Sequence, residues 1–262
     1  MKQLNYINAT YLTTPGKVSL MAGLLPSLHF YCRFIEIVFR ASRKAKRGVY
    51  HDAEWYLSSF NVLKQLEKIG ICFHVTGIDH LQRLVGPCVI IGNHMSMTET
   101  VVLPAIINPA KNITFIIKES LLRYPVFKHI MRSRNPIAVT RANPRQDLKT
   151  VMEEGVERLR KGISIVVFPQ TTRSVSFDPE QMSSIGVKLA KKAEVPVVPL
   201  ALDTSAWRNG KYIKDFGKID VSKDIYFSFG EPIHVQGKGT EEHRMVIEYI
   251  ETKLKEWKKD GK

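Results

Sequence analysis

Residues Ile163–Phe168 read ISIVVF, and this short run of mostly β-branched apolar side chains is the clearest indication of the fold class. It follows a stretch of helical spacing, Arg145–Arg160, which the pair Lys161-Gly162 closes. A short apolar run bounded by turn residues is typical of a strand buried on both faces. A helix followed by a buried strand is the repeating unit of α/β proteins, so this region predicts helices packed on a sheet.

The same alternation continues outward in both directions. Further helices are predicted at His51–Ile69, Gln181–Ala193 and Glu241–Trp257. Further strands are predicted at Ile71–Thr76, Cys88–Ile91, Asn112–Lys118, Pro136–Thr140 and Asp224–Gly230. The apolar run Val195–Leu202 contains two prolines, which favours a sheet edge or a bulge. The predicted fold class is α/β, with a mixed, largely parallel sheet flanked by helices.

The composition is that of a globular protein. Hydrophobic residues make up 44% and charged residues 24% of the 262 positions, which excludes disordered, collagen-like and coiled-coil chains. The three cysteines, Cys32, Cys72 and Cys88, cannot build a disulfide framework, and none has a metal-ligand spacing. A reducing compartment is the simpler interpretation.

The net charge of +14 indicates an anionic partner, such as a membrane surface, a phosphorylated substrate or nucleic acid. Half of this excess lies in the first 50 residues, where Glu36 is the single acid. The basic residues there are Lys2, Lys17, Arg33, Arg40, Arg43, Lys44, Lys46 and Arg47. The position of this charge bears on the choice of partner, because the segment is also apolar.

The segment Val18–Phe39 is apolar but is interrupted by Pro26, Arg33 and Glu36. Charges near the middle of a membrane span are costly, so we interpret it as a helix in the membrane interface. The basic cluster Arg43–Arg47 would then lie among anionic headgroups, where each charge contributes about 1 kcal/mol to the free energy of membrane binding. A helix packed on the protein's own core and a true span are the alternatives. The predicted division is a membrane-associated helical hairpin in residues 1–70 and an α/β domain in residues 71–262.

A histidine followed five residues later by an acid could form a pair of general base and orienting carboxylate. Three such pairs occur, where about one is expected by chance, so the pattern alone decides little and their context must choose between them. They are His74/Asp79, His94/Glu99 and His243/Glu248.

The His94/Glu99 pair is the candidate. Five residues along a helix place His243 and Glu248 on different faces, and His74 lies within a predicted strand. His94 instead follows the apolar run VIIGN, just before a helix predicted to start near Met97. A loop histidine at such a junction can fold back toward an acid in the first helical turn, where the helix dipole favours negative charge. A satisfied structural histidine is the alternative.

A phosphate site is predicted after the strand Ile163–Phe168. The loop Phe168–Ser174 reads FPQTTRS and offers Thr171, Thr172 and Arg173 at a strand end, where α/β sheets bind ligands. Lys118 and Arg141 also lie just beyond strand-like runs, so three basic side chains could converge there. A polar turn with a surface arginine is the alternative.

Several other functions lack their motifs. No GxGxxG, Walker A, HExxH or GxSxG pattern occurs, which argues against dinucleotide, P-loop, zincin and nucleophile-elbow chemistry. No nucleic-acid motif or aromatic–basic interleaving occurs either, so nucleic acid is not an expected partner.

Four ordered blocks resemble the 1-acylglycerol-3-phosphate acyltransferase (glycerolipid acyltransferase) family. The first, Asn93–Glu99, is similar to the NHxSxxD motif. The others are Lys118–Arg141, Phe168–Ser174 (similar to FPEGTRS) and Val195–Pro199 (similar to VPVVPV). The resemblance covers about Val75 to Leu202. Two departures stand out: Glu99 replaces the usual Asp, and Gln170-Thr171 replaces Glu-Gly, which leaves the acceptor open.

The resemblance implies transfer of a fatty acyl chain from acyl-CoA or acyl carrier protein to a lysophospholipid hydroxyl. In that reaction His94 is the general base and Glu99 its orienting group, while Asn93 and Ser96 support the turn. The acceptor is expected to contact Lys118, Arg141, Gln170, Thr171, Thr172 and Arg173. No metal or cofactor is expected, and the implied location is the cytoplasmic face of a membrane, as a peripheral or monotopic protein.

The expected acceptor is 1-acyl-glycerol-3-phosphate, giving phosphatidic acid. A different lysolipid acceptor and a non-catalytic lipid-binding protein on the same scaffold are the alternatives.

Overall fold

The computed structural model describes residues 3–14, 16–170 and 172–260. Within them an eight-stranded sheet has the order β1-β2-β8-β7-β3-β6-β4-β5. The strands are β1 Tyr11–Leu12, β2 Phe73–Thr76, β3 Val89–Gly92, β4 Ile113–Lys118, β5 Ile137–Val139, β6 Ser164–Val167, β7 Val197–Asp203 and β8 Ile225–Phe229. Neighbours are parallel except β1 with β2 and β7 with β8. The prediction of a mixed, largely parallel sheet is therefore confirmed.

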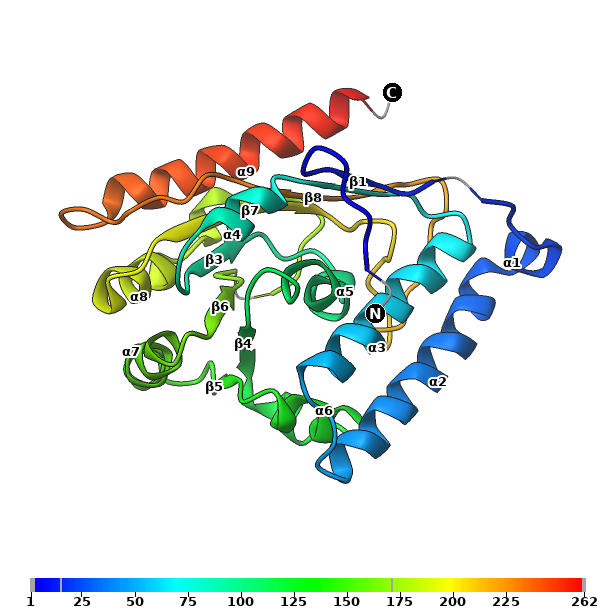
Figure 1. The fold of residues 1–262 in the computed structure, drawn as a ribbon, viewed down its shortest axis with the longest axis horizontal. Helices are drawn as coiled ribbons and strands as arrows, with labels where there is room; N and C mark the ends of the chain where they lie inside the picture. The colour runs from blue at the N-terminus through cyan, green and yellow to red at the C-terminus, as the bar shows by residue number, and fades with distance from the viewer. Residues whose placement is uncertain (1–2, 15, 171, 261–262) are drawn as a thin grey trace.

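Helices cover both faces of the sheet (Figure 1). On one face lie α2 Pro26–Lys46, α3 Asp52–Lys68, α5 Thr98–Ile107 and α6 Phe127–Ser133; on the other lie α7 Pro144–Arg160, α8 Ile185–Ala193 and α9 Thr240–Asp260. The shorter elements are α1 Leu20–Leu24, α4 Ile78–Arg83, η1 Glu119–Leu122 and η2 Pro179–Gln181. The helix predicted from Gln181 begins only at Ile185, because the 3₁₀ turn η2 precedes it.

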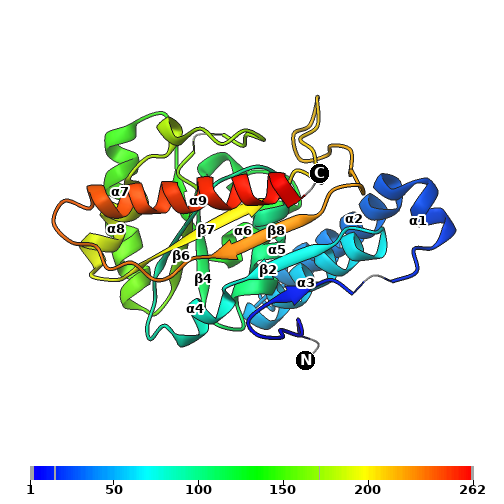
Figure 2. The ribbon, with the colours of Figure 1, turned by 90° about the horizontal axis from the view of Figure 1, so that it is seen from above.

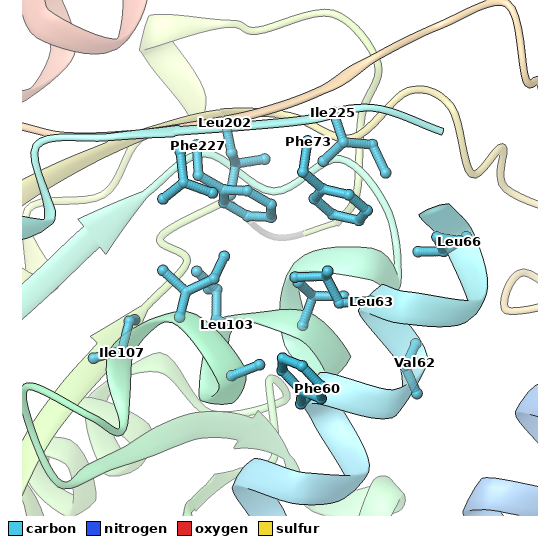
Figure 3. Packing of buried hydrophobic residues seen from close by; sticks show 14 of the residues in the cluster. Phe60, Val62, Leu63, Leu66, Phe73, Leu103, Ile107, Leu202, Ile225 and Phe227 are labelled. Atoms are coloured by element: carbon cyan, nitrogen blue, oxygen red, sulfur yellow. The ribbon is translucent and has the colours of Figure 1, made fainter. Parts of the chain in front are cut away.

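Strand alternation divides the apolar interior between these two faces. In β3, Ile90 belongs to the cluster that includes α3 and α5, whereas Val89 and Ile91 belong to the cluster that includes α7 and α8. Figure 3 shows Leu63 of α3 and Leu103 of α5 facing side chains from the sheet. A period of two along a strand buried on both sides produces this division.

The strand β7 lies in the middle of the sheet, so the predicted edge position of its two prolines is wrong. Its neighbours are β3 and β8. The predicted bulge explains how a central strand holds Pro199. Leu200 pairs with Phe229, and in a regular antiparallel ladder Val197 would then lie opposite residue 232. Val197 pairs with Ile233 instead, so the register shifts by one residue between the two pairs. Pro199 lies at this irregularity, where its carbonyl accepts from Gly230 N (2.8 Å) and no regular ladder needs its missing N–H.

The N-terminal apolar segment forms two helices. Pro26 starts α2 at a first-turn position that tolerates proline. One face of α2 is buried through Phe30, Phe34 and Val38. For that face, packing on the protein's own core, which was the alternative to an interfacial helix, is confirmed. The other side leaves apolar residues exposed on α1 and the start of α2: Leu20, Met21, Leu24, Leu25 and Leu28. No helix among the described residues is both long and apolar enough to cross a bilayer.

One of the two apolar clusters extends across residue 70. The strand β1 pairs with β2, and α3 packs against α5. Buried side chains from Leu4 to Ile69 belong to the same cluster as those of β2 and β8. The division at residue 70 thus remains a prediction about function, since the two parts share their packing.

Candidate active site

The predicted site residues lie at one edge of the sheet because their strands are parallel. Within the ladder, Ile91 of β3 lies beside Val167 of β6 and Pro199 of β7. The segments that follow these strands therefore emerge together, and they carry the His94 turn, the FPQTTRS loop and Thr204. The carboxyl edge of such a sheet is where ligands usually bind.

His94 and Glu99 form the predicted pair. The Nδ1 atom of His94 lies 2.8 Å from Glu99 Oε1. Glu99 is in the first turn of α5, so the chain folds back between the two residues as the sequence predicts. The imidazole also stacks on Phe168, with ring centroids 4.7 Å apart. Contact with a carboxylate and with a ring fixes the orientation of His94.

The Glu99 carboxylate is fully buried and saturated with donors. Oε1 accepts from the backbone N–H groups of Met95 (2.7 Å) and Ser96 (2.8 Å), and Oε2 accepts from the Thr204 hydroxyl (2.7 Å) and the Ser96 hydroxyl (3.1 Å). Burial by itself raises the pKa of Glu99. The hydrogen bond and charge of His94, with the Thr204 and Ser96 bonds, outweigh burial and hold this pKa below its ordinary value.

An ionised Glu99 only accepts hydrogen bonds, so His94 must carry its proton on Nδ1. The neutral imidazole then has its lone pair on Nε2, which is the arrangement of a general base.

Asn93 fixes the start of the turn that carries His94 to β7. Its amide nitrogen donates to the carbonyl of Leu202 (2.8 Å), and its amide oxygen accepts from the N–H of the same residue (2.9 Å). The side chain is buried. Ser96, besides its contact with Glu99, accepts from Thr98 N (3.1 Å) at the start of α5. Both residues support the turn, as expected.

The other two histidine–acid pairs do not form. His74 lies 2.9 Å from Asp224, and Asp79 pairs with Arg83 (2.6 Å). Glu248 is an ion-pair partner of Arg244, on the exposed side of α9. Of the three histidine–acid pairs five residues apart, His94/Glu99 is the one whose side chains are in contact.

Gln170 contacts the turn that carries His94 rather than open space. Its side chain is buried, and Oε1 accepts from the backbone N–H of His94 (2.6 Å). An amide oxygen can accept this bond as a carboxylate would, so the change from Glu keeps this contact. The neighbouring Thr171 lies outside the described residues.

Two arginines of the predicted phosphate site lie close together. The ion pair of Arg173 with Asp215 is 2.5 Å long, and both side chains are mostly buried. Partial loss of solvent lowers the pKa of Arg141, and the like charge of Arg173 lowers it further, against the opposing effect of Asp147. The Arg141 backbone is held in a left-handed conformation (φ 62°) by a hydrogen bond from its N–H to Asp147 Oδ2 (2.7 Å).

The remaining predicted contacts surround this pair. Lys118 ends β4, which lies between β6 and β5, so its exposed side chain starts between the loops of Arg173 and Arg141. The Thr172 hydroxyl accepts from Lys214 Nζ (3.3 Å). Cationic groups therefore outnumber the carboxylates at this edge, and mutual repulsion of the two guanidinium groups favours a bound anion.

Known proteins resemble this chain in sequence over the region that holds the site. Residues 72–203 match the model of the family described as Acyltransferase. The chain belongs to the Acyltransferase family. It is 31% identical over 170 residues to a 1-acyl-sn-glycerol-3-phosphate acyltransferase of Pseudomonas aeruginosa, covering 65% of this chain and 62% of that protein. It is 29% identical over 136 residues to a probable enzyme of that name from Mycoplasma genitalium, covering half of each.

A solved structure shares the fold of this family member. The LPA acyltransferase PlsC from Thermotoga maritima superimposes with a TM-score of 0.64 at 22% identity, covering 91% of this chain and 97% of that one. The chain thus spans less than two thirds of the length of the curated relatives above but nearly all of the solved one.

Three further residues contribute to the site of this family member but are not among the predicted site residues. Thr204 holds Glu99 from the end of β7, and its place just after an apolar strand was the available signal. Asp215 and Asn209 belong to the connection between β7 and β8, and Asn209 donates to the Met95 carbonyl (2.9 Å). Nothing in their local sequence marks them, because their partners lie more than 40 residues away.

Proposed function

We propose that this protein transfers a fatty acyl group from acyl-CoA or acyl carrier protein to the hydroxyl of a lysophospholipid. The acceptor best supported is 1-acyl-glycerol-3-phosphate, and the product is then phosphatidic acid. The observation that carries the proposal is the His94–Glu99 pair, whose buried carboxylate leaves Nε2 of the imidazole as a base.

The reaction needs one attack and no acyl-enzyme. The acceptor hydroxyl attacks the thioester carbonyl while His94 Nε2 takes its proton, and Glu99 stabilises the imidazolium that forms. A new C–O bond forms, the C–S bond breaks, and the proton on His94 goes to the leaving thiolate. Positioned proton transfer of this kind contributes typically about 10²–10⁴ in rate. The step as written uses no metal or cofactor.

The acceptor phosphate is assigned to Arg141 and Arg173, with Lys118 between their loops. Arg173 is engaged by Asp215, so a phosphate that reaches it must compete with that carboxylate or share the guanidinium. Guanidinium groups bind phosphate through two parallel hydrogen bonds, which supports a phosphorylated acceptor.

An apolar cavity beside the catalytic turn supports a site for the acyl chain. It has a volume of about 50 Å³ and lies between α2, α3, α5 and α6. Thr100 and Val101, which directly follow Glu99, form part of its wall, with Phe34 and Val62 opposite. A volume of this size holds one or two methylene groups, so α2 and α6 must move apart to admit a full chain.

The membrane is the proposed source of the acceptor and also the proposed destination of the acylated product. The exposed leucines of α1 and the start of α2 supply an apolar surface, and the basic end of α2 supplies charges for anionic lipids. The proposed location is the cytoplasmic face, with the protein peripheral or monotopic.

The test measures thiol release from palmitoyl-CoA with lysophosphatidic acid in mixed micelles. The wild type should release thiol, His94→Ala should not, and His234→Ala, a change at an exposed histidine, should behave as the wild type. Full activity of His94→Ala would refute the mechanism. Lipid binding without thiol release from any donor, carrier protein included, would instead identify a lipid-binding protein.

A further inference from the structure

The connection between β7 and β8 is an ordered hairpin, residues 207–219, rather than a loose loop. Trp207 and Ile219 bridge its base, and both are buried. Arg208 N donates to Lys218 O (3.1 Å) farther out. A side chain at Gly217 would place its Cβ 1.8 Å from the Arg208 carbonyl, so the close crossing of the two arms requires glycine.

The tip of this hairpin exposes apolar and basic side chains together. Tyr212 is 90% exposed and Ile213 is 54% exposed. Lys211 and Lys214 flank them and are exposed as well. An aromatic ring and a branched aliphatic side chain between lysines are suited to an anionic membrane interface, where apolar groups enter the acyl boundary and ammonium groups meet phosphates.

The hairpin continues the exposed apolar surface of α1 and α2. The Tyr31 hydroxyl of α2 donates to the Gly217 carbonyl, and Ile219 N donates to Ser27 Oγ (3.0 Å). Figure 2 shows the hairpin projecting beside the start of α2. Single exposed apolar residues are ordinary on protein surfaces, but here those of the hairpin tip and those of Leu20 to Leu28 belong to elements bonded to each other.

The same hairpin reaches the phosphate site. Asp215, next to the tip, pairs with Arg173, and Lys214 donates to Thr172. A hairpin seated on lipid would therefore bring the phosphate-binding loop to the level of the headgroups.

We propose that the 207–219 hairpin is a second membrane contact, which seats its tip on an anionic lipid surface beside the acceptor site. The proposal rests on the membrane source of the acceptor given under the proposed function. It adds a contact that the N-terminal helices do not provide and places it next to Arg173 of the phosphate site.

The test is sedimentation of the full chain with vesicles in the absence of substrate. One vesicle type is phosphatidylcholine alone, and the other, the anionic type, also contains phosphatidylglycerol. Tyr212→Ser with Ile213→Ser should weaken binding to both vesicle types roughly tenfold or more. Lys211→Gln with Lys214→Gln should weaken binding roughly 30-fold on the anionic vesicles only. Val85→Ser and Lys238→Gln are matched controls at exposed positions outside the hairpin, and they should leave binding unchanged.

Several results would overturn the proposal. The first is that the wild type binds neither vesicle type, and the second is that the tip variants bind as well as the wild type does. The third is that the protein forms a dimer without lipid and that the tip variants abolish this dimer. Unchanged thermal unfolding of the variants is required for the comparison. A Tyr212→Trp variant gives an independent measure, since its emission should shift to the blue with vesicles. An inactive protein that binds through the tip would refute the acyltransferase and leave this contact standing.

Discussion

Two substitutions at Glu99 separate the reach of its side chain from its charge. Glu99→Asp retains the charge but removes one methylene group, about 1.5 Å of reach. The carboxylate bonds with Met95 N and Ser96 N belong to a turn that Asn93 fixes to β7, so the turn cannot follow a shorter side chain. The 2.8 Å bond to His94 would open to roughly 4 Å, beyond hydrogen-bond distance.

Glu99→Gln retains the reach and removes the charge. The amide oxygen must replace Oε1, because three N–H donors converge there, and the NH₂ group then faces the hydroxyls of Ser96 and Thr204. Those hydroxyls can rotate to accept. The loss is therefore mainly the charge that stabilises the imidazolium.

Each substitution should lower kcat by about 10–150-fold. A hydrogen bond to a charged group contributes about 1.5–3 kcal/mol, and each 1.36 kcal/mol corresponds to roughly a factor of ten in rate. The assay is steady-state thiol release, with Glu157→Gln, at an exposed ion pair on α7, as the control. If either Glu99 variant retained more than half of the wild-type kcat at unchanged stability, the assigned role of Glu99 would be wrong.

Four further outcomes are expected. Asn93→Ala removes two buried hydrogen bonds to Leu202 and should lower the free energy of unfolding by roughly 2–4 kcal/mol, as measured by urea denaturation. Asp215→Asn releases Arg173 from its ion pair and should lower KM for lysophosphatidic acid about fivefold, while kcat stays unchanged. The factor follows because the partly screened ion pair, which opposes phosphate binding, contributes about 1 kcal/mol. Val101→Phe narrows the apolar cavity and should shift acyl-CoA preference toward shorter chains, which competition between donors would show. The folded protein holds the pKa of Glu99 below the ordinary value of a glutamate, so the wild type should exceed Glu99→Gln in free energy of unfolding at neutral pH and lose that advantage as the pH falls through the native pKa.

The sequence predicts the individual strands and helices and the His94–Glu99 contact because their signals are local. ISIVVF marks β6 by its own composition, and His94 and Glu99 are five residues apart across a strand–helix junction. The order of strands is not local, which is why β7 was misplaced at an edge. The contacts of Gln170 with the His94 backbone and of Asp215 with Arg173 join distant segments, so only the folded chain shows them.

The attachment of Asn93 to Leu202 has a consequence for the motions of the site. The Leu202 amide is hydrogen-bonded to a buried side chain within a central strand, so its hydrogen should exchange with solvent only when the whole sheet opens. The turn that carries His94 is thus attached to the part of the sheet that is expected to exchange most slowly. If His94 is the base that we propose, adaptation to acceptors of different size must come from the surrounding loops, while the geometry of the His94–Glu99 pair stays fixed.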